Sequence, residues 1–372
     1  MAIILQTVLI LGIISAVLAL ALSLADKYIA DYGEVELKIN DEEPMVVAGG
    51  NSLLSTLRDN KIFIPSACGG KGSCGYCKCQ VLEGGGPVLA TELPWLSKEE
   101  VESNTRLSCQ VKVKQDIKIQ IPEELFNVRE YDVTVESIED VTDKIKKIRW
   151  KLPEGESITF KPGQYIQIKA PEYDGGDDFD GSDEEVFRAY SIASSAGDHG
   201  YVENFIGYTK GICSTYVHKI MKEGDIVNMN GPYGDFYYKE DDGGPILLIG
   251  AGTGMAPLLS ILYHLRDNNI DRKVRMFFGA RTPDDLFVLD EMKKFEEELP
   301  DFKFMPTLSR TTPEMNWTGD TGRVTDSIDK YVEDGGGNWT AYLCGSPKMI
   351  DSIIEHLTAK GVTEDRIYYD AF

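Results

Sequence analysis

The sequence predicts a multidomain chain with four parts in order: a single N-terminal transmembrane helix, an α+β domain, an antiparallel β-barrel and an α/β domain with a parallel sheet. Three observations support this prediction: an uncharged apolar run at residues 2–25, strand patterns between Gly, Pro and Asp turns over residues 131–240, and an alternation of buried strands and helices from residue 245 onward. A chain of 372 residues is also long enough for two or three domains of about 100–200 residues each.

The composition is acidic and otherwise ordinary for a globular protein. Asp and Glu number 61 against 38 Lys and Arg, so the net charge at pH 7 is −23. Such a charge repels phosphate backbones, and we therefore predict no nucleic-acid partner. Charged residues make up 27% of the chain, which argues against global disorder, and seven cysteines are too few for a disulfide scaffold of this length.

The apolar run at residues 2–25 has the length of a membrane span. As a helix, its 24 residues would extend about 36 Å, more than the roughly 30 Å of a hydrocarbon core. A cleaved signal peptide is the alternative; Ala19 and Ala21 suit cleavage, but no basic residue precedes Lys27. We therefore expect residues 1–27 to form a transmembrane anchor.

The segment after the apolar run has the pattern of a small α+β domain. Residues 34–47 predict two strands around an Asp-Glu-Glu turn, and residues 52–60 predict a short amphipathic helix with Ser52 as its N-cap. A strand-like KIQI and then Pro122 mark the end of this domain. The predicted boundaries are residues 33–125 for the α+β domain, 126–240 for the β-barrel and 241–372 for the α/β domain.

Four cysteines have the spacing of metal-cluster ligands. Cys68, Cys74, Cys77 and Cys109 read C-x5-C-x2-C, then 31 residues, then C. Three thiolates on one glycine-rich loop and one remote thiolate suit a 2Fe-2S cluster, because glycine allows the unusual φ angles of a tight loop. Zinc and structural thiols remain as alternatives, although zinc prefers a pair-plus-pair spacing. Cys79 is expected to face the interior as a small apolar side chain.

The cysteines also predict an orientation in the membrane. Thiolate ligands persist in a reducing compartment, which favours the cytoplasmic side for the domains that follow the anchor. Lys27 at the inner boundary agrees with the excess of basic residues on that side. We therefore expect a single-pass protein of the inner (cell) membrane with its domains in the cytoplasm.

Four short segments in the predicted barrel suit an anionic, planar, aromatic ligand. They read FKPGQY at 160–165, RAYS at 188–191, KGICST at 210–215 and GPYGDF at 231–236. In the second, Arg188 supplies a guanidinium fork for a diphosphate, Tyr190 a flat face for an isoalloxazine ring and Ser191 a hydroxyl near the flavin N5. A lone RAYS is more often a strand edge, but the four segments together predict an FAD site.

The KGICST segment predicts an anion site at the start of a helix. Backbone N–H groups and hydroxyls at such a position can receive a phosphate. With Ala189 beside the arginine, the residues expected to bind FAD are Arg188, Ala189, Tyr190, Ser191, Lys210, Gly211, Cys213, Ser214 and Thr215.

The sequence ILLIGAGTGMAP predicts a buried strand, a tight glycine turn and a following helix. A pyrophosphate can approach the backbone of such a turn closely. The pattern is not G-x-G-x-x-G, and no acidic residue stands about 20 residues later at a strand end, so a simple Rossmann dehydrogenase fits poorly. With a later strand end, YLCGS, and the C-terminal aromatic, the expected dinucleotide-binding residues are Gly250, Gly252, Thr253, Gly254, Cys344, Gly345 and Phe372.

Two features of this site stay open. Phe372 either packs in the core or covers one face of the flavin. Arg310, beside Ser309 in TLSRTT, suits a 2′-phosphate, whereas Asp284 and Asp285 would repel one. The sequence therefore predicts NADH without excluding NADPH.

These motifs resemble known families. Residues 34–125 resemble a ferredoxin, whose fold is a β-grasp, and residues 160–372 resemble the ferredoxin–NADP reductase superfamily. With the apolar N-terminus, C-x5-C-x2-C, RAYS, GAGTGMAP, WTGDTG and a final DAF, the chain most closely resembles the family of the F subunit of the sodium-translocating NADH:quinone reductase. The resemblance covers nearly the whole chain.

The resemblance implies cofactors, roles and partners. It implies a 2Fe-2S cluster on the four cysteines, FAD in the barrel and NADH in the α/β domain. Ser191 would hydrogen-bond the flavin N5, Cys344 would lie near the nicotinamide C4 and Phe372 would move to admit the ring. Electrons would pass from NADH through FAD and the cluster to other integral membrane redox subunits and finally to quinone.

Other functions remain possible at this stage. The same cofactor motifs suit a membrane-anchored reductase that feeds an oxygenase or a desaturase, and the anchor alone favours the quinone reductase. A non-catalytic scaffold that keeps the fold is the third possibility. One helix without a charged residue cannot form a sodium path by itself, so sodium transport would require other subunits.

Overall fold

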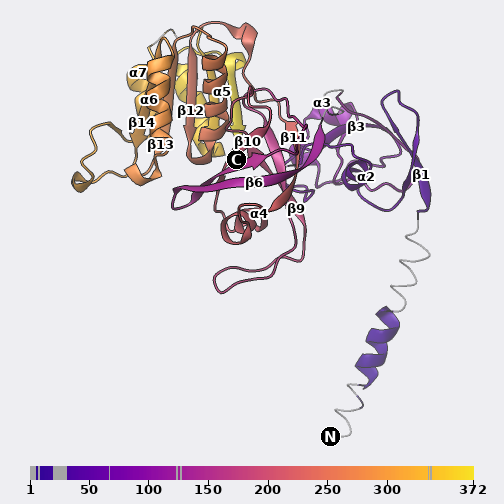
Figure 1. The fold of residues 1–372 in the computed structure, drawn as a ribbon. Coiled ribbons are helices and arrows are strands. Elements are labelled where there is room, and N and C mark those ends of the chain that lie inside the picture. Colours follow the sequence, from indigo (N-terminus) through magenta and orange to yellow (C-terminus); the bar gives the residue numbers. More distant parts are fainter. Residues whose placement is uncertain are drawn as a thin grey trace. The chain divides into compact units, whose positions relative to one another are not determined.

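The computed structural model describes residues 6, 9–19, 32–66, 68–122, 125, 128–333, 335 and 337–372. The chain divides into two compact units, residues 1–127 and residues 128–372. Figure 1 shows the elements of both units in sequence colours.

The predicted anchor lies largely outside the described residues. Of residues 1–27, positions 1–5, 7–8 and 20–27 are not among those described, whereas residues 9–19 are helical with exposed side chains. No helix in the described part of the chain is long and apolar enough to cross a membrane.

The first unit contains the α+β domain that the sequence predicts. Its elements are β1 (Glu34–Ile39), β2 (Met45–Ala48), α2 (Leu53–Asp59), β3 (Lys78–Glu83), η1 (Leu93–Trp95), α3 (Lys98–Glu102), β4 (Thr105–Leu107) and β5 (Ile117–Gln120). The sheet order is β2-β1-β5-β3-β4, in which β1 and β5 are parallel and the other neighbours antiparallel. The mixed sheet therefore brings the first and last strands of the domain side by side.

Local sequence signals explain the first elements. In β1, Val35, Leu37 and Ile39 are buried and alternate with polar residues, as expected of a strand with one face on the core. Ser52 is the predicted N-cap of α2, and its Oγ accepts the backbone N–H of Ser55 at 3.2 Å. These two predictions are confirmed.

An ion pair in the first unit is almost wholly shielded from solvent. Arg106 in β4 donates to the Glu92 carboxylate from Nε at 2.9 Å and Nη2 at 2.7 Å, and its Nη1 donates to the carbonyls of Gly85 and Gly86. The carboxylate also accepts the backbone N–H of Leu107 at 2.9 Å. Burial raises the pKa of Glu92, but these hydrogen bonds together hold it below its ordinary value. The pair therefore fixes β4 to the loop that precedes η1.

The second unit begins with an antiparallel half-barrel. Its elements are β6 (Arg129–Thr142), β7 (Ile145–Lys151), β8 (Tyr165–Ala170), β9 (Val186–Ser191), β10 (Tyr201–Gly207), α4 (Ile212–Thr215), η3 (Tyr216–Ile220) and β11 (Ile226–Tyr233). The six strands have the order β10-β7-β6-β11-β8-β9. The predicted barrel is thus only half closed, because the edge strands β9 and β10 meet through one isolated bridge between Ile192 and Asn204.

A six-stranded parallel sheet with helices on both faces follows. Its elements are β12 (Ile246–Ala251), η5 (Gly252–Gly254), α5 (Met255–Asp267), β13 (Val274–Ala280), α6 (Leu289–Glu298), β14 (Phe302–Leu308), η7 (Pro313–Met315), β15 (Asp320–Thr321), α7 (Val324–Tyr331), β16 (Thr340–Gly345), α8 (Pro347–Ala359) and β17 (Ile367–Ala371). The order is β15-β14-β13-β12-β16-β17.

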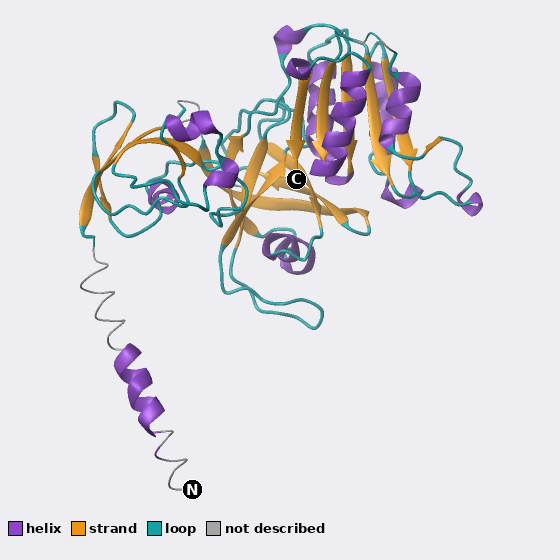
Figure 2. Cartoon of the chain, turned by 180° about the vertical axis from the view of Figure 1, so that it is seen from behind, coloured by secondary structure: helices purple, strands orange, loops and turns teal. Residues whose placement is uncertain are grey.

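Alternate residues of the parallel strands pack into two layers of core. Leu248 in β12 faces the cluster that contains α5 and α6, whereas Leu247 and Ile249 face the cluster that contains α7 and α8. Figure 2 shows helices on both sides of this sheet. This arrangement confirms the predicted α/β domain and places the carboxyl ends of its strands at one edge.

The half-barrel and the parallel sheet share contacts within the second unit. Phe205 of β10 lies in the same apolar cluster as α5, and its ring centroid is 5.0 Å from that of Phe287. The Ser260 hydroxyl of α5 donates to the carbonyl of Ser194, just beyond β9, at 2.9 Å. These contacts bring the two halves of the unit together near the predicted site residues.

Replacing Glu92 with Gln should destabilise the first unit strongly. The Arg106 side chain is 4% exposed and that of Glu92 is fully buried, and removing one charge of a buried pair costs about 3–5 kcal/mol of unfolding free energy. Because the folded pKa of Glu92 lies below the ordinary 4.5, the stabilisation is present above that ordinary value and is lost as pH falls through the folded pKa.

A matched control distinguishes the loss of this buried ion pair from the loss of an exposed one. Lys78→Gln breaks the half-exposed pair between Lys78 and Glu100 and should cost about 1 kcal/mol or less. Urea midpoints of both variants, followed by visible absorbance and repeated at pH 7 and pH 4, measure the difference. Equal midpoints for the two variants would contradict a special role for the buried pair.

Candidate cofactor and nucleotide sites

The four predicted cluster cysteines form two thiol pairs. The sulfurs of Cys68 and Cys74 are 3.3 Å apart, and the thiols of Cys77 and Cys109 are hydrogen-bonded to each other. In the described ranges, no three or more His, Cys, Asp or Glu side chains are grouped to hold one metal ion. Two pairs match a 2Fe-2S cluster, in which each iron takes two thiolates, better than a single tetrahedral zinc.

In each of the two thiol pairs, the hydrogen bond between the sulfurs favours the thiolate form of one of the two cysteines. The bond from Cys74 lowers the pKa of Cys68 to about 4, and the bond from Cys77 lowers the pKa of Cys109 to about 7. The partner thiols, Cys74 and Cys77, have raised pKa values for the same reason. Metal ligation requires thiolates, so both thiols of each pair must lose their protons when a cluster binds.

Glycines give the cysteine loop its shape. Four of them have φ between +67° and +88°: Gly69, Gly70, Gly72 and Gly75. A Cβ at Gly72 would lie 2.7 Å from Nε2 of Gln110, and that amide donates to the Cys109 sulfur at 3.6 Å. The loop therefore closes against the remote cysteine, and the residue types fit a cluster site.

Cys79 has the interior position that the sequence predicts. It is 3% exposed within the core of the first unit, and burial raises its pKa to about 12. Cys77 is equally buried but is hydrogen-bonded to Cys109, whereas the charged neighbours of Cys79 are Arg106 and Glu92 and not a second thiol. Cys79 therefore stands outside the two thiol pairs.

The predicted flavin strand is β9, which carries Arg188, Ala189, Tyr190 and Ser191, all half-buried. The Tyr190 ring packs against the core of the half-barrel, and its hydroxyl is hydrogen-bonded to the thiol of Cys213. Burial raises the pKa of Tyr190 well above its ordinary value, so the phenol stays neutral. A half-buried strand with a guanidinium, a ring and a hydroxyl fits a flavin diphosphate and its ring system.

Sequence reasoning missed the asparagine that holds this strand. Asn204 of β10 is fully buried, and its Nδ2 donates to the carbonyls of Tyr190 at 3.0 Å and Ser191 at 2.8 Å. Its Oδ1 accepts the indole N–H of Trp150 at 2.8 Å. These partners are 13 to 54 residues away in the sequence, so no local motif marks the asparagine.

The KGICST segment turns into a helix, as predicted. Lys210 has φ of +62°, and Gly211 is the N-cap of α4. The Ser214 hydroxyl accepts the N–H of Thr209 at 3.2 Å and donates to the Gly211 carbonyl at 3.0 Å. The buried members of the segment are Cys213, Ser214 and Thr215. An anion bound here would therefore meet the backbone N–H groups of the first turn, which have no acceptor within the helix.

The glycine turn between β12 and α5 has no room for side chains at two positions. A Cβ at Gly254 would lie 2.4 Å from the carbonyl oxygen of Cys344, and one at Gly250 would lie 2.8 Å from Cδ1 of Leu258. Gly252 has φ of +56°, which favours glycine. The turn is thus held against β16, and its glycines carry no side chain that would keep a pyrophosphate from the backbone, which fits such a ligand.

Thr253, Gly345 and Phe372 adjoin this turn, but Cys344 points into the core. The Cγ2 of Thr253 lies 3.4 Å from the Cβ position of Gly207 in β10, and the Phe372 N–H donates to the Gly345 carbonyl at 3.1 Å. Phe372 is 54% exposed at the carboxyl edge of the sheet, so it is not core packing.

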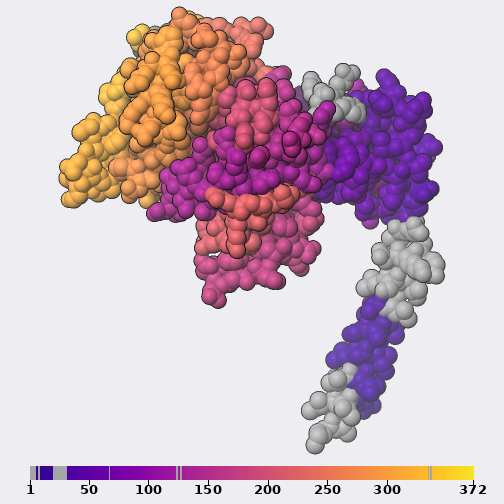
Figure 3. Space-filling model, viewed as in Figure 1, coloured from indigo at the N-terminus to yellow at the C-terminus, as the bar shows by residue number. Residues whose placement is uncertain are grey.

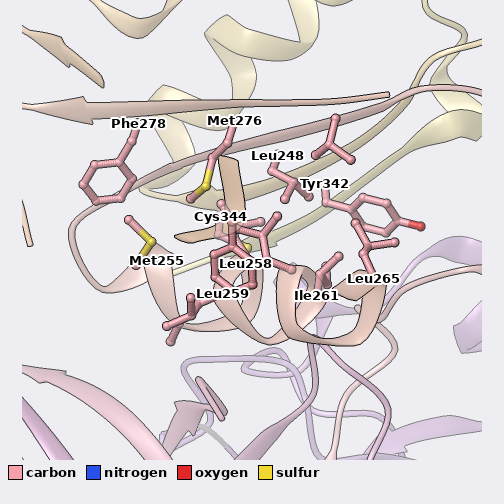
Figure 4. Close-up of a cluster of buried hydrophobic side chains, with 14 of the residues drawn as sticks. Leu248, Met255, Leu258, Leu259, Ile261, Leu265, Met276, Phe278, Tyr342 and Cys344 are labelled. Atoms are coloured by element: carbon pink, nitrogen blue, oxygen red, sulfur yellow. The ribbon is translucent and has the colours of Figure 1, made fainter. Parts of the chain in front are cut away.

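The sulfur of Cys344 lies beneath the edge, among apolar side chains. Figure 4 shows Cys344 with Leu248, Met255 and Leu258. Cys344 is 1% exposed, and burial raises its pKa well above the ordinary value. The side chain is a neutral thiol under the nucleotide edge.

Three family models match consecutive parts of the chain. Residues 37–114 match the 2Fe-2S iron-sulfur cluster binding domain, residues 132–238 the oxidoreductase FAD-binding domain and residues 248–355 the oxidoreductase NAD-binding domain. The fold, the sites and these matches together define an iron–sulfur flavoprotein oxidoreductase that uses a nicotinamide dinucleotide.

Relatives of nearly the same length narrow this class to one family. The chain is 37% identical over 396 residues to the F subunit of the Na(+)-translocating NADH-quinone reductase of Idiomarina loihiensis, and the match covers 97% of both chains. It is 35% identical to the F subunit of the same reductase of Pseudomonas aeruginosa strain PAO1, over 98% of this chain and 96% of the relative. The chain belongs to the family of these F subunits, which confirms the resemblance carried by its motifs.

Solved structures support the fold. A cytochrome P450 reductase of Amycolatopsis matches with a TM-score of 0.71 and 27% identity, over 91% of this chain and 98% of that chain. A ferredoxin reductase in carbazole 1,9a-dioxygenase matches with a TM-score of 0.68 and 26% identity, over the same shares of the two chains.

Replacing Gly254 with Ala should impair dinucleotide binding selectively. The new Cβ would lie 2.4 Å from the Cys344 carbonyl, so the turn and β16 must move apart, and displacements of this size weaken binding by about tenfold or more. Gly200→Ala is the control, since no atom lies within 4 Å of its Cβ position. The measurements are the NADH concentration dependence of flavin bleaching and the FAD and iron contents. Unchanged affinity in Gly254→Ala would contradict the assignment.

Proposed function

We propose that this chain is the electron-input subunit of a membrane-bound NADH:quinone oxidoreductase. FAD, when bound, would convert the hydride of NADH into single electrons that a 2Fe-2S cluster accepts. The observation that carries the proposal is the hydrogen bond from Ser260 to the Ser194 carbonyl at 2.9 Å, because it fixes the helix of the dinucleotide turn to the chain just beyond the RAYS strand. The proposed dinucleotide site and the proposed flavin site therefore belong to the same compact unit, residues 128–372.

The cluster would be held by Cys68, Cys74, Cys77 and Cys109. The two close sulfur pairs supply two thiolates for each iron. The closed glycine loop around them supports this assignment, as does the contact of Gln110 with Cys109.

The flavin would be held by Arg188, Ala189, Tyr190 and Ser191 of β9 and by the segment from Lys210 to Thr215. Asn204 fixes the carbonyls of Tyr190 and Ser191 and so orients the Ser191 hydroxyl, which we assign to a hydrogen bond with the flavin N5. A Ser191→Ala chain that retains its FAD and still reduces it at the normal single-turnover rate would exclude this role.

The dinucleotide would be held by Gly250, Gly252, Thr253, Gly254, Cys344, Gly345 and Phe372. Cys344 would act near the nicotinamide without touching it. Its neutral thiol is buried and would support the carboxyl edge of the sheet from below. Phe372 is exposed and attached through its backbone to Gly345, so its ring is free to move when the nicotinamide enters.

Membrane redox subunits would receive the electrons near the cysteine loop. Tyr76 lies within the loop and is 43% exposed, and Leu93 and Trp95 in η1 are 52% and 38% exposed. A Cβ at Gly75 would lie 3.0 Å from the Trp95 ring, so η1 packs directly on the loop. Exposed large apolar side chains favour a protein partner at this surface.

The anchor remains part of the proposal. The apolar side chains of residues 9–18 that line the described helix are between 50% and 61% exposed, which favours contact with lipid or with partner helices. The N-terminal residues 1–27 would cross the cell membrane once, with the domains in the cytoplasm and quinone as the final acceptor.

A reductase that feeds an oxygenase is the second candidate function. The two solved structures above are, by their names, a cytochrome P450 reductase and a ferredoxin reductase in a dioxygenase. Their identities of 27% and 26% are lower than the 37% to the quinone-reductase relative of Idiomarina loihiensis, which supports the quinone reductase.

Serine substitutions at Cys77 and Cys79 should have opposite effects on iron content. Cys77→Ser should lose the cluster, because it removes one thiolate from a pair, whereas Cys79→Ser should keep it, because that thiol belongs to neither of the two thiol pairs. Iron per FAD and the visible spectrum of the purified full chains measure the outcome. Retention of iron in Cys77→Ser with loss in Cys79→Ser would reverse the ligand assignment.

The partners are tested by purification of the tagged full chain from its own membranes in a mild detergent. We expect polytopic subunits in fixed ratio, a flavin that NADH bleaches, and quinone reduction by the assembly. An oxygenase in place of these subunits would support the second candidate function. A chain whose flavin NADH does not bleach would exclude both.

A further inference from the structure

Two side chains that flank the remote cysteine of the cluster loop carry hydrogen-bond donors. They are Ser108 and Gln110, on either side of Cys109. Both belong to the first unit, whose described residues are drawn in indigo and purple in Figure 3. Their segment directly follows β4, which the buried pair of Glu92 and Arg106 fixes. The donors therefore stand on a firmly held part of the domain.

The Gln110 amide is directed at the Cys109 sulfur. Its Nε2 donates to that sulfur at 3.6 Å. The Thr91 hydroxyl donates to Oε1 of the same amide at 3.0 Å, which fixes the amide with its N–H groups toward the sulfur. A Cβ at Gly72 would lie 2.7 Å from Nε2, so glycine at this position leaves room for the amide. The amide is therefore a preset donor to one of the four cysteine ligands.

The Ser108 hydroxyl is a buried donor beside a second ligand. Ser108 is fully buried, and its N–H donates to the Cys77 carbonyl at 2.8 Å. Its Oγ makes no hydrogen bond of good geometry within the described residues. The hydrogen bond with Cys109 and burial raise the pKa of Cys77, and the Ser108 hydroxyl acts in the opposite direction, which places it beside the Cys77 sulfur. A buried hydroxyl without an acceptor costs free energy, and a thiolate at Cys77 would supply the acceptor.

Such donors matter because a 2Fe-2S cluster changes its charge when it is reduced. One electron from the flavin adds one negative charge to the cluster and its four thiolates. A donor aimed at a ligand sulfur stabilises the form with more negative charge, and the effect is larger where water is excluded. Hydrogen bonds to the sulfurs are among the influences that set the reduction potential of iron–sulfur clusters. Both donors should therefore make the cluster easier to reduce.

Charged residues near the loop are less effective in this role. The net charge of −23 disfavours the addition of an electron to any part of the chain. Of the two lysines nearest the loop cysteines in sequence, Lys78 is paired with Glu100 at 2.7 Å and Lys71 is exposed. Water and salt screen exposed charges, whereas a neutral donor in contact with a sulfur is not screened.

We infer that Ser108 and Gln110 raise the reduction potential of the cluster by donating hydrogen bonds to its thiolate ligands. The hydroxyl donates to the Cys77 thiolate once that thiol has lost its proton, and the amide donates to Cys109. The inference rests on the proposed function, because it concerns the cluster that accepts electrons from the flavin.

The test is a redox titration of the cluster in the purified full chain, followed by the electron paramagnetic resonance signal of the reduced form. Ser108→Ala and Gln110→Met each remove one donor. Each should lower the midpoint potential by the equivalent of about a tenfold change in the equilibrium constant for reduction, which is about 59 mV for one electron. Ser108→Thr keeps a hydroxyl and should change that constant by about twofold or less.

Thr56→Val and Gln80→Met are the matched controls. Thr56 in α2 is buried, and its hydroxyl has no hydrogen-bond partner within the described residues. The Gln80 amide donates to the Ser103 carbonyl at 2.7 Å and not to a cysteine sulfur. Both controls should keep the equilibrium constant within about twofold of its original value. A shift in the controls as large as in the donor variants would overturn the inference, because a general disturbance of packing would then explain both.

The outcomes separate this inference from the proposed function. If the unaltered chain shows the signal of a reduced 2Fe-2S cluster and neither donor variant shifts its potential, the inference is overturned and the proposed function stands. If the unaltered chain shows no such signal after reduction, both fail. If Ser108→Ala loses its iron, Gln110→Met decides the inference, since Gln110 is only half-buried and its replacement leaves the core intact.

Discussion

The close approach of Gly254 to the carbonyl of Cys344 is the constraint on which the reductase half of the molecule depends. A Cβ at residue 254 would lie 2.4 Å from that oxygen. Because β12 and β16 are neighbouring parallel strands, this approach brings the glycine turn, Gly345 and Phe372 to one edge. The apolar cluster beneath, with the buried Cys344 thiol, supports the edge from within. A dinucleotide bound there, as we propose, would meet the glycine turn on a rigid support.

Buried polar side chains have comparable roles in both units. In the second unit, Asn204 holds the carbonyls of Tyr190 and Ser191 and is itself held by Trp150. In the first, the ion pair of Glu92 and Arg106 fixes β4, and so the chain that leads to Cys109. A buried polar group without partners would be costly, and a fully satisfied one fixes a unique geometry. Each group therefore orders a segment that carries predicted cofactor ligands.

The sequence predicted much of the fold because its signals are local. The alternation in β1, the N-cap at Ser52 and the glycine turn after β12 each depend on a few adjacent residues, and the structure has all three. The prediction of an antiparallel β-barrel was less accurate, because the closure of a barrel depends on how far β9 and β10 approach, and one bridge joins them. The anchor was a prediction from length and hydropathy that falls largely outside the described residues.

By itself, the sequence determined the chemistry: a C-x5-C-x2-C loop for iron and sulfur, a RAYS strand for a flavin and a glycine turn for a dinucleotide. The tertiary structure decided which thiols pair, that Cys344 lies beneath the nucleotide edge rather than on it, and that Ser108 lies beside Cys77. The physical reason is the distance along the sequence over which each signal acts. Spacing along the chain reports residues within one turn or loop, whereas burial and pairing arise when strands distant in sequence become neighbours in a sheet.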